Sequence, residues 1–197
     1  VEGQYIAHLK NIRDIIGLAP GIADFAALSL VITSRGVYFI ADTQVRPDPS
    51  SEEIAETAVL AAAHVRRFGL VPKIALLSHS DFGSYDTPSA IKMRRAVALL
   101  AAHHPELEAD GEMRGDSALS ATIRAQVLPQ SRLKGDANVL IMPNLDAANI
   151  AYQMIKGIAD ALPVGPILIG AARPAHILHA SVTARGVVNM TAVAVVE

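Results

Sequence analysis

The chain has 197 residues, a formal net charge of -2 and no cysteine. A near-neutral charge gives no reason for nucleic-acid binding, and the lack of cysteine excludes disulfides, thiolate zinc sites and a cysteine nucleophile. No uncharged apolar run approaches the length of a membrane span, so we expect a cytoplasmic protein that binds neither membrane nor nucleic acid. The residues are 51% hydrophobic but only 4% aromatic, which predicts an aliphatic core.

The first part of the chain predicts a helix followed by a hairpin. Apolar residues recur at helical spacing over residues 3–16. Two β-rich runs, 28–33 and 37–41, are separated by a short turn signal, so we expect them to pair as antiparallel strands.

The rest of the chain alternates between helical and strand patterns. Ser50 and Glu53 form a capping-box pattern, which predicts a helix over 51–68. A proline follows an N-cap at residues 86–88, where the next helix begins. The 183–196 stretch fits either a strand or a helix, and we favour a helix. The other predicted strands cover 73–77, 107–113, 138–142 and 164–169, and the other predicted helices 88–103, 116–128 and 146–162.

This alternation predicts the fold class. Strands separated by helices need crossover connections, so we expect a three-layer α/β/α fold with a mixed, mostly parallel sheet. Ligands of such sheets bind beyond the carboxyl ends of the strands.

A serine-rich connection follows the predicted strand 73–77. Ser78, Ser80, Gly83 and Ser84 could form a phosphate or acyl cradle at the start of the next helix. The same residues could equally form a connection that satisfies its own backbone groups. The pattern alone does not decide between the two.

Carboxylates and histidines are also candidates for chemistry. Asp110, Glu112 and Asp116 gather near a strand end and could bind a cation or share a proton, although helix capping and solvation explain them better. No histidine pair has the spacing of a hydrolytic zinc site, so we expect no metal here. We expect His103 and His104 to complement a helix dipole, whereas His176 and His179 could equally face a cleft or pack in the interior.

Several separate motifs carry a family resemblance. The stretches SHS, FGS and DGE, the segment 134–153 and GPILIG followed by Arg173-Pro174 resemble the phosphotransacetylase family. The stretches IADTQV, EEIAE, VRRFG, KIALLSHS, KMRRA, DGEMRGD and VVNMTAVAVVE are closer still to the phosphotransacetylase-like domain that ends bacterial NADP-dependent malic enzymes. The resemblance covers nearly the whole chain.

The resemblance implies a two-lobed module of the isocitrate and isopropylmalate dehydrogenase type, with acyl-CoA bound between the lobes. Residues 1–170 would form the main lobe, and 171–197 would return to the other, mostly absent lobe. The chain begins at Val1 without an initiator methionine, so we expect a piece whose malic enzyme region lies upstream. NADP and a divalent metal would belong to that region.

The resemblance also bears on acyl transfer. In active relatives a Ser-Arg pair follows the proline that matches Pro174, with an aspartate several residues later. Counted without gaps, these positions hold His179, Ala180 and Gly186, and no acidic residue lies between Asp160 and Glu197. We therefore assign no catalytic residue and expect a regulatory domain that binds acetyl-CoA as an effector. An active phosphate acetyltransferase and a purely structural oligomerisation domain are the alternatives.

We expect ligand contacts at residues that follow the carboxyl ends of the predicted strands. An apolar stripe on the predicted helix 146–162 could pack in the core or form an interface, and the resemblance favours a homo-oligomer, a dimer through this lobe. The predicted acyl-CoA contacts are Ser78, Ser80, Gly83, Ser84, Asn144, Gly165, Pro166, Arg173, Pro174 and His176.

Overall fold

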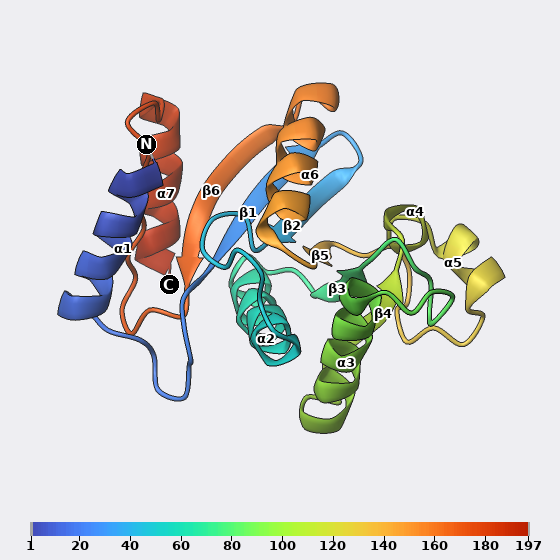
Figure 1. The fold of residues 1–197 in the computed structure, drawn as a ribbon. Helices are drawn as coiled ribbons and strands as arrows, with labels where there is room; N and C mark the ends of the chain where they lie inside the picture. Colours follow the sequence, from blue (N-terminus) through green and yellow to red (C-terminus); the bar gives the residue numbers. More distant parts are fainter. Residues whose placement is uncertain (1, 197) are drawn as a thin grey trace.

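The structure is a computed structural model that describes residues 2–196. None of the helices in this part of the chain is both long and apolar enough to cross a membrane. The elements follow in the order α1 (Glu2–Ile15), β1 (Ala26–Thr33), β2 (Gly36–Ala41), α2 (Ser51–Arg67), β3 (Lys73–Leu77), α3 (Pro88–His103), β4 (Glu108–Met113), α4 (Gly115–Ala118), α5 (Ala121–Val127), β5 (Val139–Ile141), α6 (Leu145–Ile158), β6 (Leu162–Ile169) and α7 (Ala184–Val196) (Figure 1).

The strands form one sheet in the order β4-β3-β5-β2-β1-β6. Strands β2, β5, β3 and β4 run parallel to their neighbours in this order, whereas β1 is antiparallel to both β2 and β6. The register places the start of β1 opposite the ends of β2 and β6, since Leu28 pairs with Ala41 and Ile167. The carboxyl ends of β2 to β6 therefore meet at one edge of the sheet, where ligands of such folds bind.

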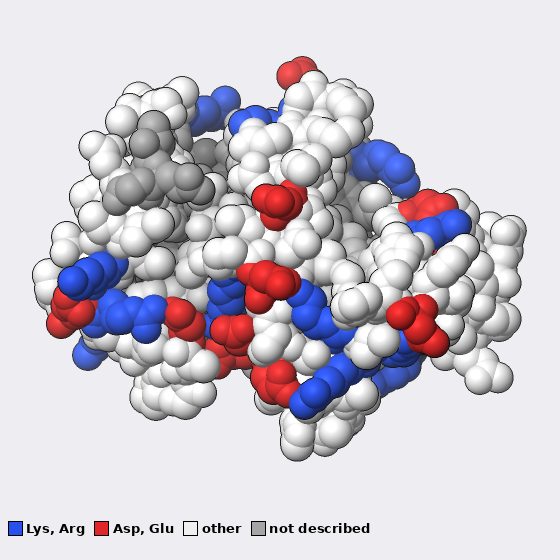
Figure 2. Space-filling model, in the orientation of Figure 1, with Lys and Arg blue, Asp and Glu red and all other residues white. Residues whose placement is uncertain are grey.

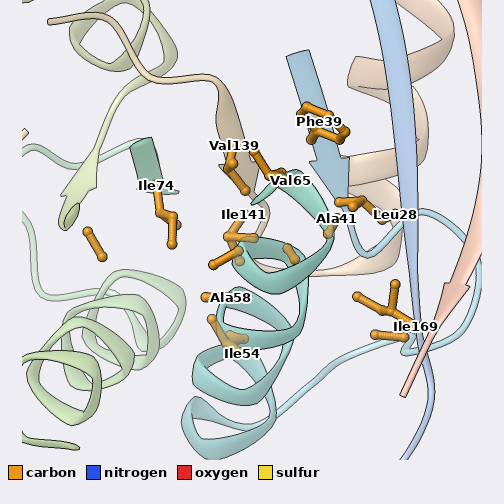
Figure 3. Packing of buried hydrophobic residues seen from close by; sticks show 14 of the residues in the cluster. Leu28, Phe39, Ala41, Ile54, Ala58, Val65, Ile74, Val139, Ile141 and Ile169 are labelled. Atoms are coloured by element: carbon orange, nitrogen blue, oxygen red, sulfur yellow. The ribbon is translucent and has the colours of Figure 1, made fainter. Parts of the chain in front are cut away.

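Helices cover both faces of the sheet. Figure 3 shows Ile54, Ala58 and Val65 of α2 directed towards Val139 and Ile141 of the sheet. Side chains alternate along each strand, so Ile40 and Leu140 belong to a second cluster on the other face, where α6 packs. The expected three-layer fold with a mixed, mostly parallel sheet is confirmed.

Most predicted elements are confirmed, and local hydrogen bonds explain the exceptions. The capping box at Ser50 and Glu53 is present, and residues 184–196 form a helix. The helix predicted over 116–128 is instead two short helices, because the Ser120 hydroxyl accepts from the Ile123 amide and starts a new turn. Helix α6 ends earlier than predicted, and β6 begins earlier because Leu162 already pairs with Ile32 of β1.

The two segments that connect the sheet to α1 and α7 are bonded to each other. The Ala19 amide donates to the Gly170 carbonyl at 2.9 Å, and the Ala172 amide donates to the Gly17 carbonyl at 3.0 Å. We call these paired segments, residues 17–19 and 170–172, the seam. The division of the chain into lobes at residue 170 stays a prediction.

Candidate functional site

A cavity of about 690 Å³ lies between α1 and α6, beside the segment that follows β2. We call it the α1–α6 cleft. It opens at the sheet edge expected for ligand binding, and its volume is typical of small-molecule and cofactor sites. Its lining consists of Tyr5, Ile6 and Leu9 from α1, Thr43, Gln44, Val45 and Pro47 after β2, Leu145, Asp146, Asn149 and Ile150 from α6, and His179.

The buried carboxylate of Asp42 shapes one wall of the cleft. Its Oδ1 accepts from the amides of Gln44 and Val45 at 2.9 and 3.0 Å, and its Oδ2 accepts from the Arg46 amide at 3.1 Å. Burial raises the pKa of Asp42 to about 6, although these amide bonds act in the opposite direction. The carboxylate therefore fixes the path of the chain that lines the cleft.

Tyr5 and His179 bring α1 and the C-terminal segment together in the cleft. Their rings stack with centroids 5.7 Å apart and planes 20° from parallel. The Tyr5 hydroxyl is buried and has no hydrogen-bond partner among residues 2–196. Burial, and secondarily the charge of Asp42, raise the pKa of this hydroxyl well above its usual value, so it stays protonated.

The serine-rich connection uses its polar groups internally. Ser80 is fully buried, and its hydroxyl donates to Oε1 of Glu112 at 2.8 Å. The Gly83 amide donates to the same oxygen at 2.8 Å, and the Ser84 hydroxyl accepts from the Asp81 amide. The amides of 78, 80, 82, 84 and 85 also donate within this region. These contacts fit a connection that satisfies its own backbone better than an open phosphate cradle.

Three other predicted contact residues lie at different places. Asn144 caps α6, with its side-chain oxygen accepting from the Ala147 amide at 2.9 Å, and it borders the cleft at Leu145. Gly165 and Pro166 lie inside β6, so their placement at a strand exit was wrong. Gly165 has a φ of 123°, and a Cβ there would lie 3.2 Å from the Leu28 carbonyl oxygen, so close contact with β1 explains the glycine.

The last three predicted residues are not part of the cleft lining. Arg173 and Pro174 line a smaller hollow beside α2. His176 accepts from the Leu168 amide through Nδ1 at 3.2 Å, which holds the C-terminal segment against β6. None of the ten predicted contacts is in the cleft lining, and Asn144 is the one that directly precedes a lining residue, Leu145.

The three candidate carboxylates do not converge either. Asp110 accepts from Ser131 and from the Arg132 amide, whereas Glu112 lies under the serine-rich connection and Asp116 pairs with Arg114. Within residues 2–196, no group of three or more histidine or acidic side chains is placed to hold a metal ion.

His179, which by sequence could equally face a cleft or pack in the interior, lines the cleft. The other lining residues were not predicted, because no ligand contact was expected after β2. Thr43 and Gln44 belong to the stretch IADTQV, directly after a predicted strand, so the strand-exit rule could have identified them. Tyr5 and Asn149 carry no such signal, because only the folded chain brings α1 and α6 to this edge.

The chain is similar to known proteins over nearly its whole length. The phosphate acetyl/butaryl transferase family matches residues 1–195. The chain is 57% identical to the NAD-dependent malic enzyme of Rhizobium meliloti over its whole length, and 45% identical to the NADP-dependent malic enzyme of Escherichia coli over 99% of its length. It spans only 26% of each of these relatives.

A solved structure agrees with the sequence comparison. A phosphotransacetylase from Streptococcus pyogenes superposes with a TM-score of 0.91 at 30% identity. The match covers 95% of this chain and 58% of that structure.

Proposed function

The chain belongs to the phosphate acetyl/butaryl transferase family, and on that premise we propose that it binds an acyl-CoA, acetyl-CoA first, as a regulatory effector. The regulated activity would be that of malic enzyme domains in a longer protein, the oxidative decarboxylation of malate to pyruvate. The α1–α6 cleft is the observation that carries this proposal, since it unites elements from both ends of the chain at the ligand-binding edge.

The lining of the cleft suits the acyl and pantetheine parts of such a ligand. Ile6, Leu9 and Val45 offer apolar contacts, while the side-chain amide of Gln44 and the Asn149 side-chain oxygen can bond to the pantetheine amides. The Asn149 NH2 group donates to the Thr43 carbonyl at 3.4 Å. Of the contacts predicted from the sequence, the proposal retains Asn144. It does not require the serine-rich connection, whose polar groups are already bonded.

The proposal assigns binding without acyl transfer. Transfer needs a base for the CoA thiol and donors for the oxyanion. The segment 161–196 supplies no carboxylate, and both oxygens of Asp42 are bonded to amides. Asp146 of the cleft lining is exposed in the first turn of α6, so burial does not drive it to take a proton from a thiol. A ligand held here changes malic enzyme activity if it binds two conformations of the protein with different affinity.

Active phosphate acetyl transfer is the second candidate, and one observation favours it. His179 lies in the cleft, where its ring stacks on that of Tyr5. Burial raises the pKa of Asp42 to about 6, and the charge of Asp42 acts on Tyr5. A carboxyl that titrates in this range could serve as a base if ligand binding released it from the loop amides.

A structural role in oligomerisation is the third candidate. Ile150, Met154 and Ile158 of α6 are 58, 55 and 80% exposed, and they follow one another at four-residue spacing. In Figure 2 the visible face of α6 is mostly uncharged, whereas charged side chains gather over α2 and α3. We propose that this face of α6 forms a homodimer contact. Met154→Glu should then shift the mass in solution towards the monomer, whereas Lys156→Glu on the same helix should not.

The coenzyme of the proposed malic enzyme region is NAD or NADP. The sequence resemblance favoured NADP, but the relative at 57% identity is named as NAD-dependent. Either coenzyme and a divalent metal would act outside this chain.

Calorimetric titration of acetyl-CoA into the full-length protein tests the proposal. We expect saturable heat, a change in malate oxidation and no acetyl-CoA formation from acetyl phosphate and CoA. Asn149→Trp, which fills the cleft from α6, should weaken binding by at least about tenfold, or 1.4 kcal/mol. Gln153→Trp, one turn further and exposed, is the matched control. Absence of both heat and activity change would refute the proposal.

A further inference from the structure

We propose that a second hollow, separate from the cleft, binds a phosphate-type dianion. The hollow has a volume of about 180 Å³ and lies between α2 and the residues that follow β6. In Figure 1 the carboxyl end of β6 lies between α7 and α2. Arg67 of α2 and Arg173 after β6 both line it, and we call it the arginine hollow.

The charges distinguish this hollow from three other cavities. The α1–α6 cleft is lined by Asp146 and by no lysine or arginine of the described chain. A third cavity has Glu52 and Glu56 in its wall, and a fourth combines Arg66 with two glutamates. The arginine hollow has two arginines and, among the residues described, no carboxylate in its wall. Its potential therefore favours an anion.

Neither arginine is neutralised by a described neighbour. Arg67 and Arg173 form no ion pair with any carboxylate that the structure describes, although Arg46, Arg94 and Arg95 all do. Arg67 also lies in the last turn of α2, where its charge complements the helix dipole. The dipole accounts for Arg67 but not for Arg173, which comes from another segment and lines the same hollow.

His64 contacts the guanidinium of the exposed Arg67. Its Nδ1 lies 3.1 Å from the Leu60 carbonyl, and its Nε2 lies 3.4 Å from Nη1 of Arg67. In the tautomer that donates to Leu60, Nε2 accepts from Arg67. This contact uses one edge of the guanidinium and leaves its other N–H groups for a ligand.

Guanidinium groups bind phosphate oxygens through paired N–H donors, and two of them suit a doubly charged group. The hollow has room for about six waters at about 30 Å³ each, which accommodates one phosphate group with bridging water. The dianion could be a free phosphate compound or a phosphate of the proposed coenzyme ligand itself. Both sources share this chemistry.

The test uses inorganic phosphate as the probe and the full-length protein. Phosphorus NMR line broadening and calorimetry, at constant ionic strength, should show saturable binding. Arg67→Gln and Arg173→Gln should each weaken it by at least about tenfold. Arg66→Gln removes the same charge one residue away and lines a different cavity, so it should bind like the wild type. Non-saturable binding, or equal loss in Arg66→Gln, would overturn the proposal.

A second arm identifies the source of the phosphate. Titration of acetyl-CoA into the Arg67→Gln, Arg173→Gln double variant should leave its affinity unchanged if the hollow takes a free anion. A matching loss of acetyl-CoA affinity would instead assign the hollow to the coenzyme's own phosphates, while the phosphate arm alone decides whether the anion site exists. The phosphate arm does not depend on acetyl-CoA binding, so failure of the regulatory proposal can be told apart from failure of this one.

Discussion

Replacing Asp42 by asparagine should change how the stability of the protein depends on pH. Asp42 is 5% exposed, and burial raises the pKa of its carboxyl from 3.8 to about 6. Between these two values the folded protein binds more protons than the unfolded chain, so the free energy of unfolding falls as pH rises. At about 1.36 kcal/mol for each pH unit, the difference corresponds to about 3 kcal/mol, and the full cost persists above about pH 6.

Asp42→Asn removes this titration. The asparagine oxygen can still accept from the amides of Gln44 and Val45, but its NH2 group faces the Arg46 amide, which adds a cost that does not depend on pH. Urea unfolding at a series of pH values measures the outcome. The wild type should lose about 3 kcal/mol relative to the variant between about pH 3.5 and pH 7. A wild-type stability that stayed constant or rose relative to that of the variant over this pH range would refute the reasoning. Asp14→Asn, at an exposed site, controls for the lost charge.

Three further substitutions test local contacts, each by chemical or thermal unfolding. Ser50→Ala should cost about 1 kcal/mol through loss of the α2 cap, and an unchanged stability would contradict the role of the cap. Arg124→Met should cost about 3 kcal/mol because the buried guanidinium donates to carbonyls that would lose their partners, while Arg132→Met at an exposed site should cost little. Tyr5→Phe should leave stability unchanged or raise it by about 1 kcal/mol, and a clear loss would reveal a partner for its hydroxyl.

Local sequence signals predicted the elements well because the interactions that set them are local. Ser50 and Glu53 are three residues apart and bond each other's backbone, so the start of α2 could be read directly. The break at Ser120 was missed because the apolar pattern continues across it, whereas the contacts that interrupt the helix include the Ser120 hydroxyl with Ile123 and the Ala121 amide with distant Asp136.

The site was harder to predict because its polar groups are satisfied by distant residues. The serine-rich connection had the composition of an anion cradle, but Glu112, 32 residues after Ser80, occupies its hydroxyl and the Gly83 amide. No spacing rule anticipates that pairing. The cleft itself depends on Tyr5 and His179, which come from opposite ends of the chain and meet only after folding.

The seam described above couples the two ends of the chain to each other. Residues 17–19 and 170–172 are bonded to each other, so the connections to α1 and to the C-terminal segment are held together at one place. We expect a displacement of α1 to reach the start of the C-terminal segment through these bonds. A molecule that displaced either segment would then shift both chain ends together.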